Sequence, residues 1–107
     1  MKIAVAGPYT AHTQEQRERN LEAMNKAAAR LLEMGHIPLV GVNAALPVVQ
    51  QAHIADNYKA IMDISLALID NCEAILVLGD SPGVQQEKDL LSGKGLPVYY
   101  SMDEIPR

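Results

Sequence analysis

The segment from Ser81 to Glu87 holds the residues best suited to chemistry. Ser81 is a favourable N-cap and Pro82 suits the first position of a helix, so a helix is predicted to begin here. Glu87 follows Gly83 by four residues, and residues at this spacing share one helix face, with side chains leaning toward the N-terminus. The Glu87 carboxylate would then point into the space beside Gly83, where a sugar ring could approach. The alternative is a solvated glutamate behind an ordinary cap.

A second carboxylate, Asp63, lies in a helical segment, residues 61–66, that is otherwise largely apolar. A carboxylate on a buried helix face is costly unless it is paired or used. Asp63 is therefore a candidate partner for Glu87 in acid–base chemistry. The alternative is an ordinary ion pair with Lys59, which precedes it by four residues.

A third group follows the first apolar run, where Gly7-Pro8 is succeeded by Tyr9 and Thr10. A tyrosine at the carboxyl end of a strand can line a pocket with its ring and donate a hydrogen bond through its hydroxyl. The alternative is a tyrosine packed at the rim of the domain. This loop matches neither the Walker loop nor the glycine-rich dinucleotide motif.

The elements that must position these groups alternate along the chain. Short apolar runs predict strands at 3–6, 37–40, 74–78 and 97–100, and helical spacing predicts helices from Thr13 to Gly35, at 55–71 and from Ser81 to 93–95. Residues 42–54 are ambiguous, and a loop with a helical turn is one interpretation of 44–51. The pattern predicts one three-layer α/β domain over 1–107, flavodoxin- or Rossmann-like, with a parallel sheet of four or five strands. The Pro38 strand is expected at an edge and strand 74–78 at the centre.

Such sheets bind ligands beyond the carboxyl ends of their strands. The loops that matter most are therefore those after the first strand and after strand 74–78. These two loops carry Gly7 to Thr10 and Ser81 to Gly83, so the topology is expected to bring them together.

Composition limits the classes of partner. The 107 residues carry a formal net charge of -4, which argues against binding a nucleic acid polymer. No stretch reaches transmembrane length, and the single cysteine, Cys72, allows no internal disulfide, so a cytoplasmic protein that does not bind membranes is expected. The three histidines show no metal-ligand spacing with each other or with Cys72. A core this small favours a homodimer or a larger homo-oligomer.

Together these residues resemble the nucleoside 2-deoxyribosyltransferase superfamily, including its deoxynucleotide N-glycosidases. The resemblance covers nearly the whole chain. It is carried by the Gly7 to Thr10 loop, by Asp63 ahead of strand 74–78, by Ser81-Pro82-Gly83 with Glu87, and by the run 95–98.

The resemblance implies cleavage or transfer of the N-glycosidic bond of a nucleoside or its 5′-monophosphate, without metal or cofactor. Glu87 would be the nucleophile in a retaining double displacement through a covalent glycosyl-enzyme. Asp63 would orient Glu87 or manage a proton, and Tyr9 would help place Glu87 or the sugar. Ser81 and nearby N–H groups would hold a phosphate, if the substrate has one.

Two other hypotheses stay open. One is a nucleotide-binding module that keeps the fold but not the turnover, which the charged pair Lys88-Asp89 directly after Glu87 favours. The other is a structural α/β domain whose carboxylates are merely solvated.

Overall fold

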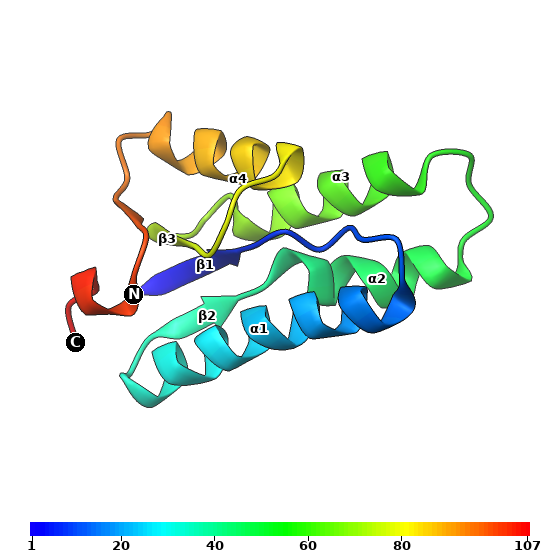
Figure 1. Cartoon of the computed structure of the whole chain (residues 1–107). Coiled ribbons are helices and arrows are strands. Elements are labelled where there is room, and N and C mark those ends of the chain that lie inside the picture. Colours follow the sequence, from blue (N-terminus) through cyan, green and yellow to red (C-terminus); the bar gives the residue numbers. More distant parts are fainter.

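Four strands and four α-helices make up the protein in a computed structural model that describes residues 1–107 (Figure 1). No helix combines the length and the apolar character needed to cross a membrane. In chain order the elements are β1 (Lys2–Ala6), α1 (Gln14–Glu33), β2 (Ile37–Leu39), α2 (Gly41–Gln51), α3 (Asn57–Ile69), β3 (Ala74–Val77), α4 (Pro82–Ser92), β4 (Val98–Tyr99) and the 3₁₀ turn η1 (Met102–Glu104).

The strands form one parallel sheet in the order β2-β1-β3-β4. Ile3 of β1 lies opposite Pro38 of β2 on one side and Ala74 of β3 on the other. The edge position of the Pro38 strand and the interior position of β3 are confirmed, as is the three-layer α/β fold with four parallel strands. The order is flavodoxin-like, and the connections change direction between β1 and β3.

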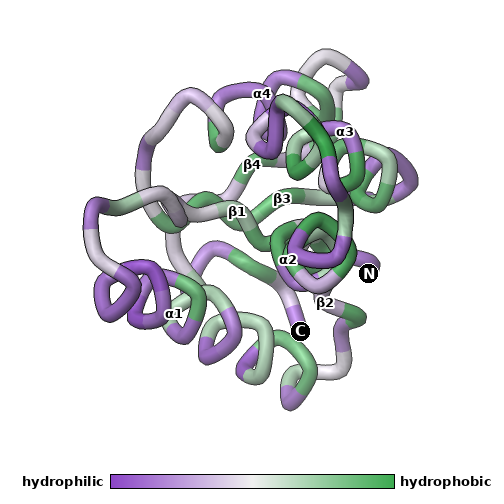
Figure 2. Tube along the Cα trace, turned by 90° about the vertical axis from the view of Figure 1, so that its right-hand side faces the viewer, coloured by the Kyte–Doolittle hydropathy of each residue, from purple (hydrophilic) through white to green (hydrophobic).

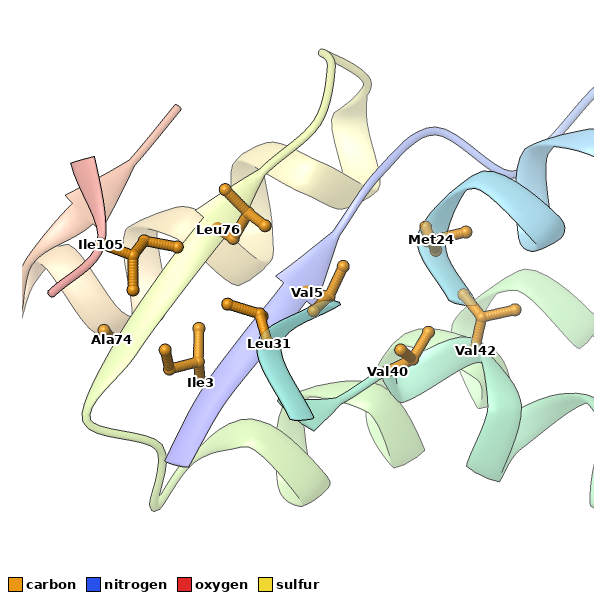
Figure 3. Close-up of a cluster of buried hydrophobic side chains, with 9 residues drawn as sticks. All are labelled: Ile3, Val5, Met24, Leu31, Val40, Val42, Ala74, Leu76 and Ile105. Atoms are coloured by element: carbon orange, nitrogen blue, oxygen red, sulfur yellow. The ribbon is translucent and has the colours of Figure 1, made fainter. Parts of the chain in front are cut away.

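The two central strands bury side chains on both faces, which divides the core in two. Ile3, Val5 and Leu76 pack with Met24 and Leu31 of α1 on one face (Figure 3). On the opposite face, a second cluster joins the sheet to α3 and α4; its members are Ala4, Ala6, Ile69, Cys72, Ile75, Val77, Val84 and Leu91.

The layers are visible when the molecule is viewed along the sheet (Figure 2). Helix α1 lies on one side, with hydrophobic residues toward the strands and hydrophilic residues outward, and α3 and α4 lie on the other. Helix α2 packs chiefly on α3, and it starts directly after β2.

The predicted ends of α1 are confirmed. The Thr13 hydroxyl accepts a hydrogen bond from the backbone N–H of Gln16 at the first turn. At the other end Gly35 has φ +95°, and the N–H of His36 reaches back to the carbonyl of Leu31. This is the left-handed glycine stop that lets the chain turn sharply into β2.

The interpretation of 44–51 as a loop with one helical turn was wrong, because α2 is a full helix of 11 residues. Pro47 inside it disfavours a helix when the segment is considered alone. However, Val42, Ala45 and Val49 recur at helical spacing and are all buried. Packing of this face outweighs the local propensity.

The contact between α2 and α3 depends on a missing side chain at Gly41. A Cβ there would lie 2.6 Å from the Cβ and 2.8 Å from the Oγ of Ser65, which is itself buried. Such distances are far inside van der Waals contact, so only glycine lets the two helices approach this closely.

We therefore expect Gly41→Ala to destabilise the fold by about 1–3 kcal/mol, because the added methyl forces the helices apart. Urea unfolding measures the loss. Val48→Ala, on the exposed side of the same helix, is the matched control and should change stability by less than about 0.5 kcal/mol. Equal stability of Gly41→Ala and the wild type would contradict this account of the packing.

Candidate active site

A cavity of about 460 Å³ opens where the loops after β1 and β3 meet. The two strands are paired along their length, so their carboxyl ends lie side by side (Figure 1). This is the position at which the sheet order reverses and where open α/β sheets bind ligands. The cavity is therefore the candidate site.

The loop after β1 supplies one wall, formed by Gly7, Pro8, Tyr9 and Thr10. Gly7 permits a close approach of α1, because a Cβ there would lie 3.1 Å from the Cγ of Met24, which is tighter than ordinary packing. All four residues that the sequence indicated in this loop line the cavity.

The loop after β3 and the first turns of α4 supply a second wall, formed by residues 81–84 and Glu87. The hydroxyl of Ser81 accepts a hydrogen bond from the N–H of Val84 at 3.2 Å, and the carbonyl of Ser81 accepts one from Gln85. The predicted cap and the helix that starts at Pro82 are both confirmed. Ser81, Gly83 and Glu87 line the same cavity as Tyr9, as expected.

Glu87 occupies a position in α4 at which an apolar residue would be expected. The buried residues of this helix are Val84, Glu87 and Leu91, which form its core-facing stripe. Only 6% of Glu87 is exposed. Burial alone raises the pKa of its carboxyl group from an ordinary value of 4.5 to about 7, with no opposing contribution from a neighbouring charge or hydrogen bond.

Side chains of α3 fill the space beside Gly83, so the expectation that the Glu87 carboxylate points into this space was wrong. A Cβ on Gly83 would lie 3.2 Å from the Sδ of Met62 and 3.6 Å from the hydroxyl oxygen of Tyr58. Gly83 therefore lets α3 approach α4, and Glu87 lines the cavity together with Gly83.

The expectation that Asp63 shares the pocket was wrong. Asp63 does not line the cavity; its side chain is 62% exposed and pairs with Lys59 at 2.8 Å. The buried residues of α3 are Met62, Ser65 and Ile69. Asp63 is one position beyond Met62, about 100° around the helix, and this rotation carries it away from the cavity.

Sequence reasoning missed the wall that α3 and α2 contribute, formed by Tyr58, Ile61, Met62 and Val42. A signal was present, because Tyr58, Ile61 and Met62 have the spacing of one helix face. The hydroxyl of Tyr58 also accepts a long hydrogen bond, 3.4 Å, from the Nε2 of Gln86 on α4.

The cavity therefore combines one buried carboxyl group with two phenols, two aliphatic hydroxyls and an apolar wall. No lysine, arginine, histidine or aspartate lines the cavity, and Glu87 is the one acidic residue that does. No three histidine, cysteine or acidic side chains anywhere in the chain lie close enough together to hold a metal ion. Such a site suits an uncharged ligand with one apolar face and several hydroxyl groups.

The chain belongs to the family of the domain of unknown function DUF1937, whose model matches residues 1–102. No curated protein matches the chain. The matched range extends from β1 into η1 and contains every residue that lines the cavity.

The buried carboxyl group makes stability depend on pH. Between about pH 4.5 and 7 the folded protein keeps a proton on Glu87 that the unfolded chain has lost, so wild-type stability falls as the pH rises through this range. Glu87→Gln carries no charge at any pH. We therefore expect its free energy of unfolding, relative to that of the wild type, to increase between about pH 5 and pH 8 by as much as about 3 kcal/mol.

Urea unfolding at both pH values measures this gain. The matched control is Asp89→Asn, which neutralises an exposed carboxylate on the same helix and should show no such dependence. A difference between wild type and Glu87→Gln that is the same at pH 5 and pH 8 would refute the burial argument.

Proposed function

We propose that this protein cleaves or transfers the N-glycosidic bond of a nucleoside, as an enzyme of the nucleoside 2-deoxyribosyltransferase type with Glu87 as nucleophile. The observation that carries the proposal is the Glu87 carboxyl group, 6% exposed, facing a cavity at the switch point of a parallel sheet. Residues of the type that would place a sugar, Tyr9 and Ser81, line the same cavity.

The proposed reaction has two displacements at the anomeric carbon. The ionised Glu87 oxygen forms a bond to that carbon while the bond to the base nitrogen breaks, and the base leaves with the electron pair and takes up a proton. Water or a second base then attacks the same carbon and releases the carboxylate, so that configuration is retained overall.

The leaving base needs a proton, and no second carboxyl group lines the cavity to supply it. The phenols of Tyr9 and Tyr58 and bound water are the remaining sources under the proposal. Tyr58, Ile61 and Met62 form the wall that suits the flat apolar faces of a base, and the hydroxyls of Thr10 and Ser81 suit the sugar.

The site favours an unphosphorylated nucleoside over its 5′-monophosphate. The first three residues of α4 leave one backbone N–H for an anion, that of Gly83, because Pro82 has no N–H and the N–H of Val84 is bonded to Ser81. No cationic side chain lines the cavity, and a phosphate would share it with Glu87. Repulsion between the two groups would weaken binding and hinder ionisation of the carboxyl group.

The second candidate is a non-catalytic nucleotide-binding module of the same fold. The lack of a second carboxyl group in the cavity favours it. The charged pair after Glu87 does not favour it, because Lys88 lines a separate hollow with Asp80 and Tyr100, and Asp89 is exposed. The expected homo-oligomer stays a prediction; exposed apolar side chains at Val48 and Ile54 are consistent with one.

Chromatography of a panel of 2′-deoxynucleosides, ribonucleosides and their monophosphates, with and without an acceptor base, tests the proposal. We expect turnover of an unphosphorylated nucleoside and a loss of at least about a thousandfold in Glu87→Ala, because the covalent step has no substitute. The carboxylate must be ionised to attack, so kcat/KM should rise with pH and level off above about pH 7.

Asp89→Asn is again the matched control and should turn over at the wild-type rate. Turnover by Glu87→Ala at the wild-type rate would exclude Glu87 as the nucleophile. Binding of nucleosides without turnover of any panel member would replace the enzyme with the binding module.

A further inference from the structure

The loop of residues 7–12 supplies four residues to the cavity yet has little backbone support. None of the backbone–backbone hydrogen bonds outside the regular elements involves these six residues. The loop spans from the end of β1 to the cap of α1 at Thr13. Something other than backbone pairing must therefore hold Tyr9 and Thr10 where they line the site.

Two side chains of α1 reach back to this loop. The guanidinium of Arg17 donates through Nη1 to the carbonyl of Ala11 at 2.8 Å, and the amide of Asn20 donates through Nδ2 to the carbonyl of Tyr9 at 3.0 Å. Both side chains are half-buried, whereas the polar residues at 14–16 and 18–19 of the same turns are exposed.

Each of the two side chains is in turn oriented by a glutamine of α1. Gln14 accepts from the Nε and Nη2 of Arg17 at 3.2 and 2.9 Å. Gln16 donates to the Oδ1 of Asn20 at 2.8 Å, which leaves the Asn20 amide nitrogen directed at Tyr9. One end of each side chain is thus bound to the helix and the other to the loop.

We propose that Arg17 and Asn20 are positioning residues for the cavity and hold the loop in its ligand-ready conformation. A loop without these bonds would have to be ordered at the moment of binding, and that ordering costs affinity. The proposal rests on the proposed function only for the choice of ligand. Neither residue lines the cavity, so neither would touch the ligand.

Asn20→Asp tests the proposal, because it keeps the shape and the acceptor for Gln16 but sets an oxygen against the Tyr9 carbonyl. We expect KM for the nucleoside to rise roughly three- to tenfold, the value of one net hydrogen bond, with kcat little changed. Amide hydrogen exchange in residues 7–12, followed by mass spectrometry without ligand, should become faster. Asn20→Ala, which deletes the donor and favours the helix, should show both effects.

Arg19→Met is the matched control on the same helix, because Arg19 is exposed and its ion pair is with Glu15, at 3.9 Å, rather than with the loop. It should change neither KM nor exchange in the loop. Arg17→Met should act as Asn20→Ala does, and Arg17→Lys, which keeps one donor for Ala11, should restore part of the loss.

The outcomes separate this proposal from the proposed function. If the wild type turns over a nucleoside and Asn20→Asp matches it in KM and in loop exchange, the positioning role is wrong. A fall in kcat at unchanged KM, with a lowered Tm, would indicate a structural role alone and would also overturn it. If the wild type binds no nucleoside but loop exchange still rises in Asn20→Asp, the proposed function fails and the role of the two residues stands.

Discussion

The burial of one carboxyl group is the constraint on which the rest of this structure depends. Glu87 occupies the core-facing stripe of α4 between Val84 and Leu91, where an aliphatic residue would stabilise the fold. Burial raises the pKa of its carboxyl group to about 7, because the carboxylate loses the hydration that stabilises it in water. A cost of this kind is typical of functional sites, where pKa values are shifted toward the pH of use.

The fold places that group by topology rather than by local sequence. Because β1 pairs with β3, the loops that follow these two strands meet, although residues 13–77 lie between them in the sequence. Glycines then allow the close approaches that shape the cavity: Gly83 accommodates α3, and Gly41 brings α2 against α3. Val84 and Leu91, on the same buried stripe as Glu87, fix α4 on the sheet and with it the direction of Glu87.

Much of this arrangement could be predicted from the sequence. Apolar runs, the cap at Thr13 and the stop at Gly35 located β1 and α1, and Pro38 located an edge. The cavity residues of the two loops followed from the rule for parallel sheets. Three predictions failed because each depended on packing between helices, and one of them concerned the space beside Gly83, which α3 fills. The α2 segment is helical because its face of Val42, Ala45 and Val49 is buried. Asp63 turns outward because the buried residues of α3 set its rotation; these are Met62, Ser65 and Ile69.

The proposed function requires that Glu87 form a covalent bond to the sugar of a nucleoside. A 2-fluoro-2-deoxy nucleoside slows the second displacement and lets a glycosyl-enzyme accumulate. Intact and peptide mass spectrometry of the wild type after incubation with this compound detects such an adduct directly. We expect a mass increase of one fluorosugar on the peptide that carries Glu87, and none in Glu87→Gln. Release of the base without any adduct, or an adduct on another residue, would contradict it.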